Sequence, residues 1–299
     1  MELALTRSST GSSRNCSSPL ERVGREGLLD LAFVRRGGRT VLARRRFTHP
    51  LQALEPVRAS DGTLYLMMLN TSGGMVGGDH LRTTVEVGAE AETALITASA
   101  NKAYRSMGTP AIQESVIRLG FGATLEYLPD HLIPHPGAIV HQSLRVEMES
   151  RSRAILYDAI AAGRIGRGER WKFGELRTET VITRESRPLY IHRARIIPGS
   201  QALNDLGWAQ DFNYLASFVI VGDSAPDGTT YRWSSLSDAL DTSLRHCGAY
   251  GGVSELERDG GIVRFVAQSA SDLSRTAQTL WGVARRFLLR REAFAWRKF

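Results

Sequence analysis

Cysteine is scarce in this sequence, and long apolar runs are missing. The two cysteines, Cys16 and Cys247, are too few for the disulfide framework of a small secreted domain. No segment approaches the roughly 18 to 20 consecutive apolar residues that cross a bilayer. The Ser- and Arg-rich residues 1–25 also lack the continuous apolar stretch of a secretory signal. We therefore expect a cytoplasmic protein with no membrane partner and with a disordered N-terminal tail over residues 1–25.

The short motifs of common enzymes are missing as well. The sequence contains no H-E-x-x-H, no C-x-x-C, no G-x-S-x-G and no Asp-rich calcium loop. A glycine-rich stretch is present, but Asp79 and His80 follow its last glycine, where a phosphate-binding loop has Lys and then Ser or Thr. These absences favour a protein without catalytic activity, and they exclude a nucleotide site at that stretch.

Charge is plentiful and mostly positive. The formal net charge is +7 and the sequence pI is about 9.8, with arginines clustered in residues 35–46 and 285–297. Such a surface attracts nucleic acid, anionic membranes and acidic proteins alike, or only keeps the protein soluble, so charge selects no partner. With 299 residues, 42% of them apolar, and no biased linker, we expect a single domain over residues 26–299.

Alternation of apolar and polar residues dominates most of the chain and indicates β-strands. Strands at this close spacing, with no helices between them, predict a mainly β fold that is rich in antiparallel pairs. The expected strands cover residues 28–34, 63–69, 81–87, 94–98, 113–119, 124–128, 138–148, 154–160, 175–183, 188–196 and 215–221.

Helical spacing replaces this alternation in the last third. It predicts a helix over residues 235–247, with Ser235 and Asp238 as a capping box, and a longer helix that opens at Ser271 and continues through residues 273–288. Two short strands are expected between these helices, at residues 253–256 and 262–267.

Four glycines, Gly73, Gly74, Gly77 and Gly78, lie within six residues between two expected strands. Glycine adopts positive φ freely and lets another backbone approach closely, so the stretch predicts a crowded, tight connection, most simply a hairpin. The Asp79 carboxylate is expected to accept hydrogen bonds from amides that the turn leaves free.

Three histidines lie close together in the sequence: His131, His135 and His141. Imidazole is a favoured ligand of nickel, copper and zinc, and Asp130 would complete a mixed site. Two prolines break any helix here, so the spacing of His131 and His135 places them on no common face. Unrelated loop histidines are the alternative interpretation.

Two further segments combine cations with other polar groups. The first is Lys102 with Tyr104, Arg105 and Ser106, at the end of an expected strand. It suits an anion or an acidic partner, although a solvated strand end explains it equally well.

The second segment alternates glycine with arginine through Gly163, Arg164, Arg167 and Gly168. It exposes amides and guanidinium groups together, which suits a carboxylate or a phosphate. A mobile solvent loop is the alternative.

Taken together, residues 70–79, 102–106, 125–129 and 158–169 resemble the urease accessory protein family called UreD, or UreH in some organisms. The order and spacing of these segments match that family over residues 26–299. Each motif is weak alone, but their common register is specific. Residues 98–101 depart from the Gln and Thr that many members carry there.

The resemblance implies a scaffold for urease maturation that is not an enzyme. Members of this family bind apo-urease and recruit the F and G accessory proteins, of which G is a GTPase that delivers nickel. The implied fold is an elongated stack of β-sheets. The family also implies an internal passage for Ni²⁺ that binds the ion only transiently, with no tightly bound cofactor and no nucleic-acid partner.

The matched motifs then suggest roles for particular residues. Four motif acids are the candidates for lining a nickel passage, namely Asp79, Glu126, Asp158 and Glu169. A buried carboxylate paired with Arg105 or Arg164 would give the same pattern. His131 and His135 are weaker candidates because they lie outside the motifs. The candidates for architecture or partner binding are Gly73, Gly74, Gly77, Gly78, Lys102, Tyr104, Arg105, Ser106, Gly163, Arg164, Arg167 and Gly168.

Two functions of other classes stay as alternatives. A hydrolase on a β-scaffold would require a nucleophile and a base within hydrogen-bond reach in a cleft. A nucleic-acid-binding protein would use the arginine clusters and would bind with a steep salt dependence.

Overall fold

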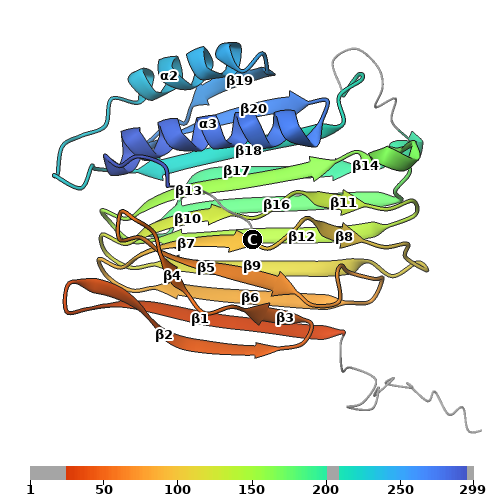
Figure 1. Cartoon of the computed structure of the whole chain (residues 1–299), viewed down its shortest axis with the longest axis horizontal. Helices are drawn as coiled ribbons and strands as arrows, with labels where there is room; N and C mark the ends of the chain where they lie inside the picture. Colours follow the sequence, from red (N-terminus) through yellow and green to blue (C-terminus); the bar gives the residue numbers. More distant parts are fainter. Residues whose placement is uncertain (1–24, 201–208, 295–299) are drawn as a thin grey trace, which may run out of the picture.

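The computed structural model describes residues 25–200 and 209–294. The tail predicted for residues 1–25 lies outside this range except for its last residue. The described chain is mainly β, with two α-helices in its C-terminal part, as predicted (Figure 1). Most of its strands belong to two stacked sheets.

The smaller sheet has seven strands. In spatial order they are β17 (Arg187–Ile196), β16 (Glu175–Arg184), β12 (Ile139–Met148), β9 (Ala111–Leu119), β6 (His80–Val87), β1 (Glu26–Arg36) and β2 (Arg39–Thr48).

The larger sheet has eleven strands. Its main path runs through β19 (Tyr250–Glu255), β20 (Gly260–Ala267), β18 (Tyr214–Gly222), β13 (Arg153–Ala161), β10 (Thr124–Leu128), β7 (Glu92–Thr97), β5 (Leu64–Asn70) and β3 (Leu51–Ala53). Three short strands join at its side, β4 (Val57–Arg58), β8 (Asn101–Ala103) and β11 (Leu132–Pro134), while β14 (Gly163–Arg164) and β15 (Glu169–Arg170) form a separate pair.

The chain winds between the two sheets, and this winding sets the strand directions. From β5 to β16 it passes repeatedly from one main sheet to the other, so neighbours such as β6 and β9, or β7 and β10, run parallel. Antiparallel pairs occur towards the two ends of the stack, for example β1 with β2 and β18 with β20. The predicted stacking is confirmed, but its centre is parallel, because alternating patterns look the same whether the next strand pairs with the last or crosses over.

The glycine-rich stretch follows the same course. It connects β5 of the larger sheet to β6 of the smaller one, so the predicted hairpin is wrong. The connection is a crossing between sheets, at the point where one coil of the chain ends and the next begins.

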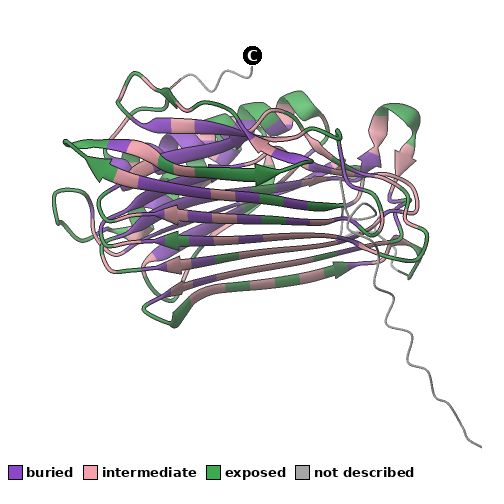
Figure 2. Ribbon diagram, turned by 90° about the horizontal axis from the view of Figure 1, so that it is seen from below, coloured by how far each residue is buried: buried purple, intermediate pink, exposed green. Residues whose placement is uncertain are grey.

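Two apolar clusters stabilise the stack. One lies between the sheets and includes Phe33, Leu66 and Ile117, and the other lies between the larger sheet and the helices α2 (Trp233–His246) and α3 (Ala270–Leu289). Buried and exposed bands alternate along the strands in Figure 2. Both faces of the central strands of the larger sheet are therefore covered, whereas the smaller sheet has one face in solvent.

The helix starts differ from those predicted. Helix α3 is capped by Ser269, whose Oγ accepts a hydrogen bond from the Asp272 amide at 3.1 Å, two residues before the expected Ser271. Helix α2 begins at Trp233 without a side-chain cap, so the predicted Ser235 capping box is wrong. Trp233 packs against Tyr231 and Phe287, and this contact extends the helix past the capping signal. None of the described helices has the length and apolar character that a membrane crossing requires.

Candidate functional site: a polar cavity between the sheets

The glycine-rich stretch and the Lys102 segment lie against each other. The Met75 amide donates to the Lys102 carbonyl at 2.7 Å, and the Tyr104 amide donates to the Met75 carbonyl at 2.8 Å. A Cβ on Gly74 would lie 2.6 Å from the Lys102 oxygen, and one on Gly77 would lie 2.5 Å from the Thr109 oxygen. Only glycine allows so close an approach of two backbones, which is what the doubled glycines predicted.

Asp79 closes this connection. Its Oδ2 accepts a hydrogen bond from the Val76 amide at 2.8 Å, as predicted, and the residue is 5% exposed. Burial raises the pKa of the Asp79 carboxyl. The carboxylate therefore stabilises the turn, and it is not among the groups that line the cavity described below.

Glu126 lies on the other side of the larger sheet, under α3. The Trp281 Nε1 donates to its Oε2 at 2.6 Å, and the Arg285 Nε lies 3.1 Å from the same oxygen. Glu126 is 1% exposed. Glu126 is thus a buried carboxylate paired with an arginine, as the alternative interpretation predicted. The arginine is Arg285, however, and not Arg105 or Arg164.

Burial raises the pKa of Glu126 to about 7, against the opposing effect of Arg285. A carboxyl whose pKa is higher in the folded state stabilises the fold below its unfolded pKa, and this contribution is lost as the pH rises through the folded value. We expect the wild-type free energy of unfolding to lose about 2.5 kcal/mol from this group between pH 5 and pH 8, at about 1.4 kcal/mol per pKa unit.

Urea denaturation of the wild type and of Glu126→Gln at several pH values tests this. Other titrating groups are shared, so the difference in unfolding free energy between the two proteins isolates Glu126. A difference that stays constant from pH 5 to pH 8 would show that Glu126 is charged throughout.

Glu169 is paired with Arg164. The Arg164 Nε and Nη2 donate to its two carboxylate oxygens at 2.5 Å and 2.8 Å. This cation lowers the pKa of the Glu169 carboxyl. The pair joins β14 to β15 across η1 (Ile165–Arg167), so Glu169 supports a loop at the end of the stack and does not face the cavity.

Asp158 alone of the four predicted acids faces the space between the sheets. It belongs to β13, where Leu156 and Ile160 on the same face pack in the apolar cluster between the sheets. The carboxylate lines a cavity of about 160 Å³. Although its surface is accessible from this cavity, protein surrounds it, and burial raises the pKa of its carboxyl.

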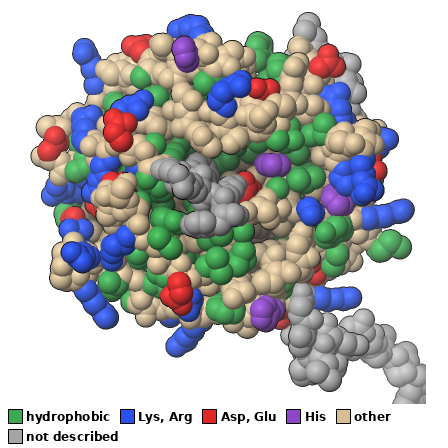
Figure 3. All heavy atoms as spheres, in the orientation of Figure 1, with side chains coloured by type: hydrophobic (Ala, Val, Ile, Leu, Met, Phe, Trp, Pro, Cys, Tyr) green, Lys and Arg blue, Asp and Glu red, His purple; other side chains and the backbone are tan. Residues whose placement is uncertain are grey.

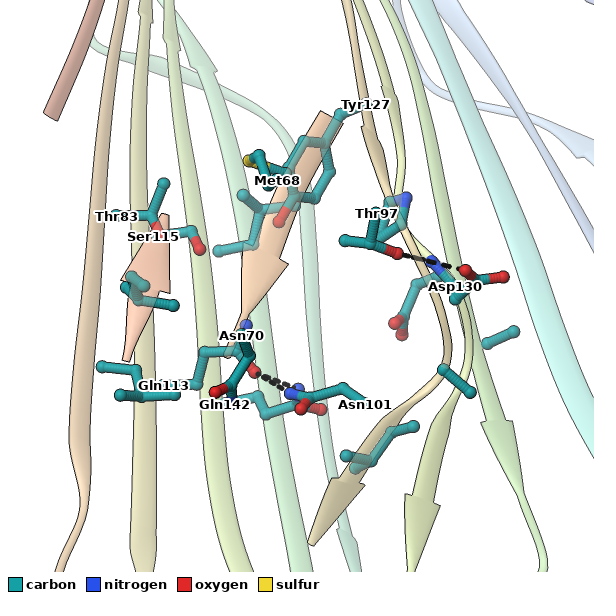
Figure 4. A pocket seen from close by; sticks show the side chains of 18 of the residues that line it. Met68, Asn70, Thr83, Thr97, Asn101, Gln113, Ser115, Tyr127, Asp130 and Gln142 are labelled. Carbon is teal, nitrogen blue, oxygen red and sulfur yellow. Dashed lines mark hydrogen bonds between the residues drawn. The ribbon is translucent and has the colours of Figure 1, made fainter. Parts of the chain in front are cut away.

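The cavity is lined by polar side chains from both sheets (Figure 4). On the smaller sheet, Gln142 Nε2 donates to Gln113 Oε1 at 2.9 Å. On the opposite side, Thr97 Oγ1 accepts from the Asp130 amide at 2.7 Å. The lining also holds apolar side chains such as Leu29 and Leu81, so carboxylates, amides and hydroxyls share the cavity with apolar groups. Glu179 belongs to the lining, but its carboxylate accepts a hydrogen bond from the exposed Arg193 on the neighbouring strand.

These lining residues were missed, although the sequence held a signal for them. Gln113 pairs in register with Gln142, and Gln142 pairs with Thr178 on the next strand. Thr83 pairs with Ser115 in the same way. Polar residues therefore occupy inward-facing positions that lie opposite each other on neighbouring strands. These pairings can be recognised only when it is known which strands are neighbours.

The three candidate histidines have separate surroundings. The His131 ring lies 5.3 Å from that of Tyr214, and the His135 ring 4.8 Å from that of Tyr104, both edge to face. His141 Nε2 lies 3.4 Å from a Glu175 oxygen. Within residues 25–200 and 209–294, no group of three or more His, Cys, Asp or Glu side chains is arranged to hold a metal ion.

Two sheets wound as one coil define a solenoid-like β-protein, with a cavity between the sheets that both polar and apolar side chains line. A family model described as "UreD urease accessory protein" matches residues 25–298. The chain belongs to this UreD family.

Curated relatives agree with this assignment. A urease accessory protein UreD of Herpetosiphon aurantiacus is 31% identical over 90% of this chain and 94% of its own length. UreD 2 of Streptomyces griseus is 33% identical over 89% of this chain and 92% of its own length. UreD of Deinococcus radiodurans is 36% identical over 69% of this chain and 74% of its own length.

Proposed function

We propose that this protein acts in the cytoplasm as a scaffold in urease maturation. It binds apo-urease and recruits the F and G accessory proteins, and G supplies nickel in a GTP-dependent step. The protein itself carries out no catalysis. Nickel, as cargo, passes through the cavity between the sheets on its way to the urease active site. Membership of the UreD family supports the maturation role.

The cavity is the observation that supports the passage. Oxygen ligands suit a cation that has to be released again, because a site of few weak ligands holds Ni²⁺ less firmly than a histidine or thiolate cluster. Asp158 and Asp130 supply carboxylates to the lining, amides and hydroxyls supply its other polar groups, and apolar side chains such as Leu29 and Leu81 supply the rest. Among the described lining residues there is no imidazole or thiol, which favours transit over the hydrolase alternative.

A deletion strain tests the proposal. Without this chain, we expect urease at ordinary nickel concentrations to accumulate without nickel and without activity, and we expect the purified chain to capture apo-urease together with F and G. Normal urease activity in the deletion strain would contradict the scaffold role.

Complementation of that strain tests the passage separately. Asp158→Asn keeps the shape of the side chain but removes the charge, so we expect urease of several-fold lower nickel content, with capture of the partners unchanged. Asp238→Asn, on the exposed face of α2, is the matched control and should restore full nickel content. Equal nickel contents for the two variants would place the nickel route elsewhere.

A further inference from the structure

A second concavity, of about 430 Å³, opens at the end of the stack where β8, β11 and β14 lie together (Figure 1). Its lining joins the two cationic segments that the sequence singled out, which are about 60 residues apart. The residues that matter are Lys102, Tyr104, His135, Arg164, Arg167 and Tyr214. None of these six residues lines the cavity between the sheets.

Three cations line this concavity, and two of them are available to a ligand. Arg164 is held by both oxygens of Glu169. Lys102 and Arg167 are exposed and form no ion pair with any residue in the described part of the chain. Figure 3 shows Lys, Arg and His side chains close together at the right of the molecule, the side on which β8, β11 and β14 lie in Figure 1.

The pKa of the His135 imidazole is affected by all three cations. Burial lowers its pKa, and the charges of Arg164, Lys102 and Arg167 lower it further, while Glu169 opposes them. Cations from β8 and from the loop after β14 therefore act on one ring. Tyr104 packs edge to face on that ring and contributes an aromatic wall.

The loop that carries Arg167 is held in place. Arg170 donates to the carbonyls of Gln210 and Phe212 at 2.8 Å and 3.1 Å, and the Trp171 amide donates to Ala162 at 2.7 Å. Gly163 has a φ of +141° and lies so close to the Glu169 carbonyl that a Cβ would be 2.1 Å from it. The positive concavity is therefore built into the fold before any ligand arrives.

We propose that this concavity is an oxyanion site, in which Lys102 and Arg167 bind a carboxylate or phosphate group and the tyrosine and histidine rings enclose it. Charge-assisted hydrogen bonds to such groups are among the stronger polar contacts of proteins, and guanidinium matches their geometry. The group belongs either to a small free anion or to an acidic segment of a partner protein. The site is a binding function in addition to the proposed scaffold role, and it is measurable on the purified chain alone.

Calorimetric titration at low salt with two probes tests the site: inorganic phosphate, and a tetraglutamate peptide blocked at both ends. Lys102→Gln/Arg167→Gln should weaken binding at least tenfold. Arg36→Gln/Arg39→Gln removes the same charge from an exposed turn elsewhere and should leave binding unchanged. Phosphate binding alone would identify a small free anion as the ligand, and tighter peptide binding would identify an acidic partner segment.

An NMR titration of His135 in the wild type provides a second readout that does not depend on the variants. A bound anion offsets the nearby cations, so the pKa of His135 should rise when a probe is present. The proposal is overturned if neither probe binds, if both double variants lose affinity equally, or if the His135 pKa does not move at saturating probe.

Discussion

Arg285→Met is expected to lower the free energy of unfolding by about 3 to 5 kcal/mol, as loss of one partner in a buried charge cluster does. Arg285 is fully buried in α3. Its Nη2 donates to Asp61 at 2.6 Å, its Nη1 donates to the Glu292 carbonyl at 2.6 Å, and its Nε lies 3.1 Å from Glu126. Methionine keeps much of the apolar stem but leaves both carboxylates without this cation.

Thermal unfolding and urea denaturation measure the loss, which corresponds to a fall in melting temperature on the order of 10 °C. Arg275→Met is the matched control, because Arg275 is also on α3 but its pair with Asp272 is exposed, and such pairs contribute about 0.5 kcal/mol or less. A loss no larger than that of the control would show that water reaches the cluster.

The pH dependence of this loss separates the two carboxylates. Protonation removes the charge of Glu126 below its raised pKa, so the deficit of Arg285→Met should be smaller at pH 6 than at pH 8. Adding Glu126→Gln to Arg285→Met should restore part of the stability at pH 8, because the two residues are in contact and their effects do not add.

The strands could be predicted from the sequence because alternation of side chains is a local property of extended backbone. The winding between sheets could not, because parallel and antiparallel neighbours share that alternation. The predicted capping box of α2 was wrong for a related reason. A local signal at Ser235 was outweighed by the packing of Trp233 on Tyr231 and Phe287, which brings together distant parts of the chain.

The candidate acids show the same limit. Glu126 and Asp158 both belong to strands of the larger sheet, whose central strands are buried on both faces, so alternation does not tell which face meets the cavity. The structure places Leu125 and Tyr127 between the sheets and therefore turns Glu126 towards α3. On β13, Leu156 and Ile160 pack between the sheets, and Asp158 shares their face, so Asp158 is turned towards the smaller sheet.

The Glu169 pair shows what motif matching adds and where it stops. The sequence offered Arg164 as a partner for a motif acid, and the structure contains that pair. The motif could not show that the two residues belong to a two-stranded turn, or that the turn lies beside Lys102, because that juxtaposition depends on three successive coils of the chain.

Gly163→Ala is expected to open this turn. The φ of +141° lies in a region that only glycine occupies readily, and the new Cβ would lie 2.1 Å from the Glu169 carbonyl oxygen. Strain and overlap together cost about 3 kcal/mol, so the open form of the loop becomes on the order of 100-fold more populated. Trypsin, which cuts after Arg164, Arg167 and Arg170, should then cleave the loop faster by a similar factor.

Gly166→Ala is the matched control in the same loop, because a Cβ there meets no atom within 4 Å and the backbone is outside the left-handed region. It should leave the cleavage rate nearly unchanged. The Gly163 variant should also lose affinity for phosphate or tetraglutamate while its circular dichroism stays that of the wild type, since the two main sheets do not depend on β14 and β15. Equal tryptic rates for the two variants would mean that the loop backbone relaxes around the added methyl group. The oxyanion site would then not depend on the fixed conformation of the turn.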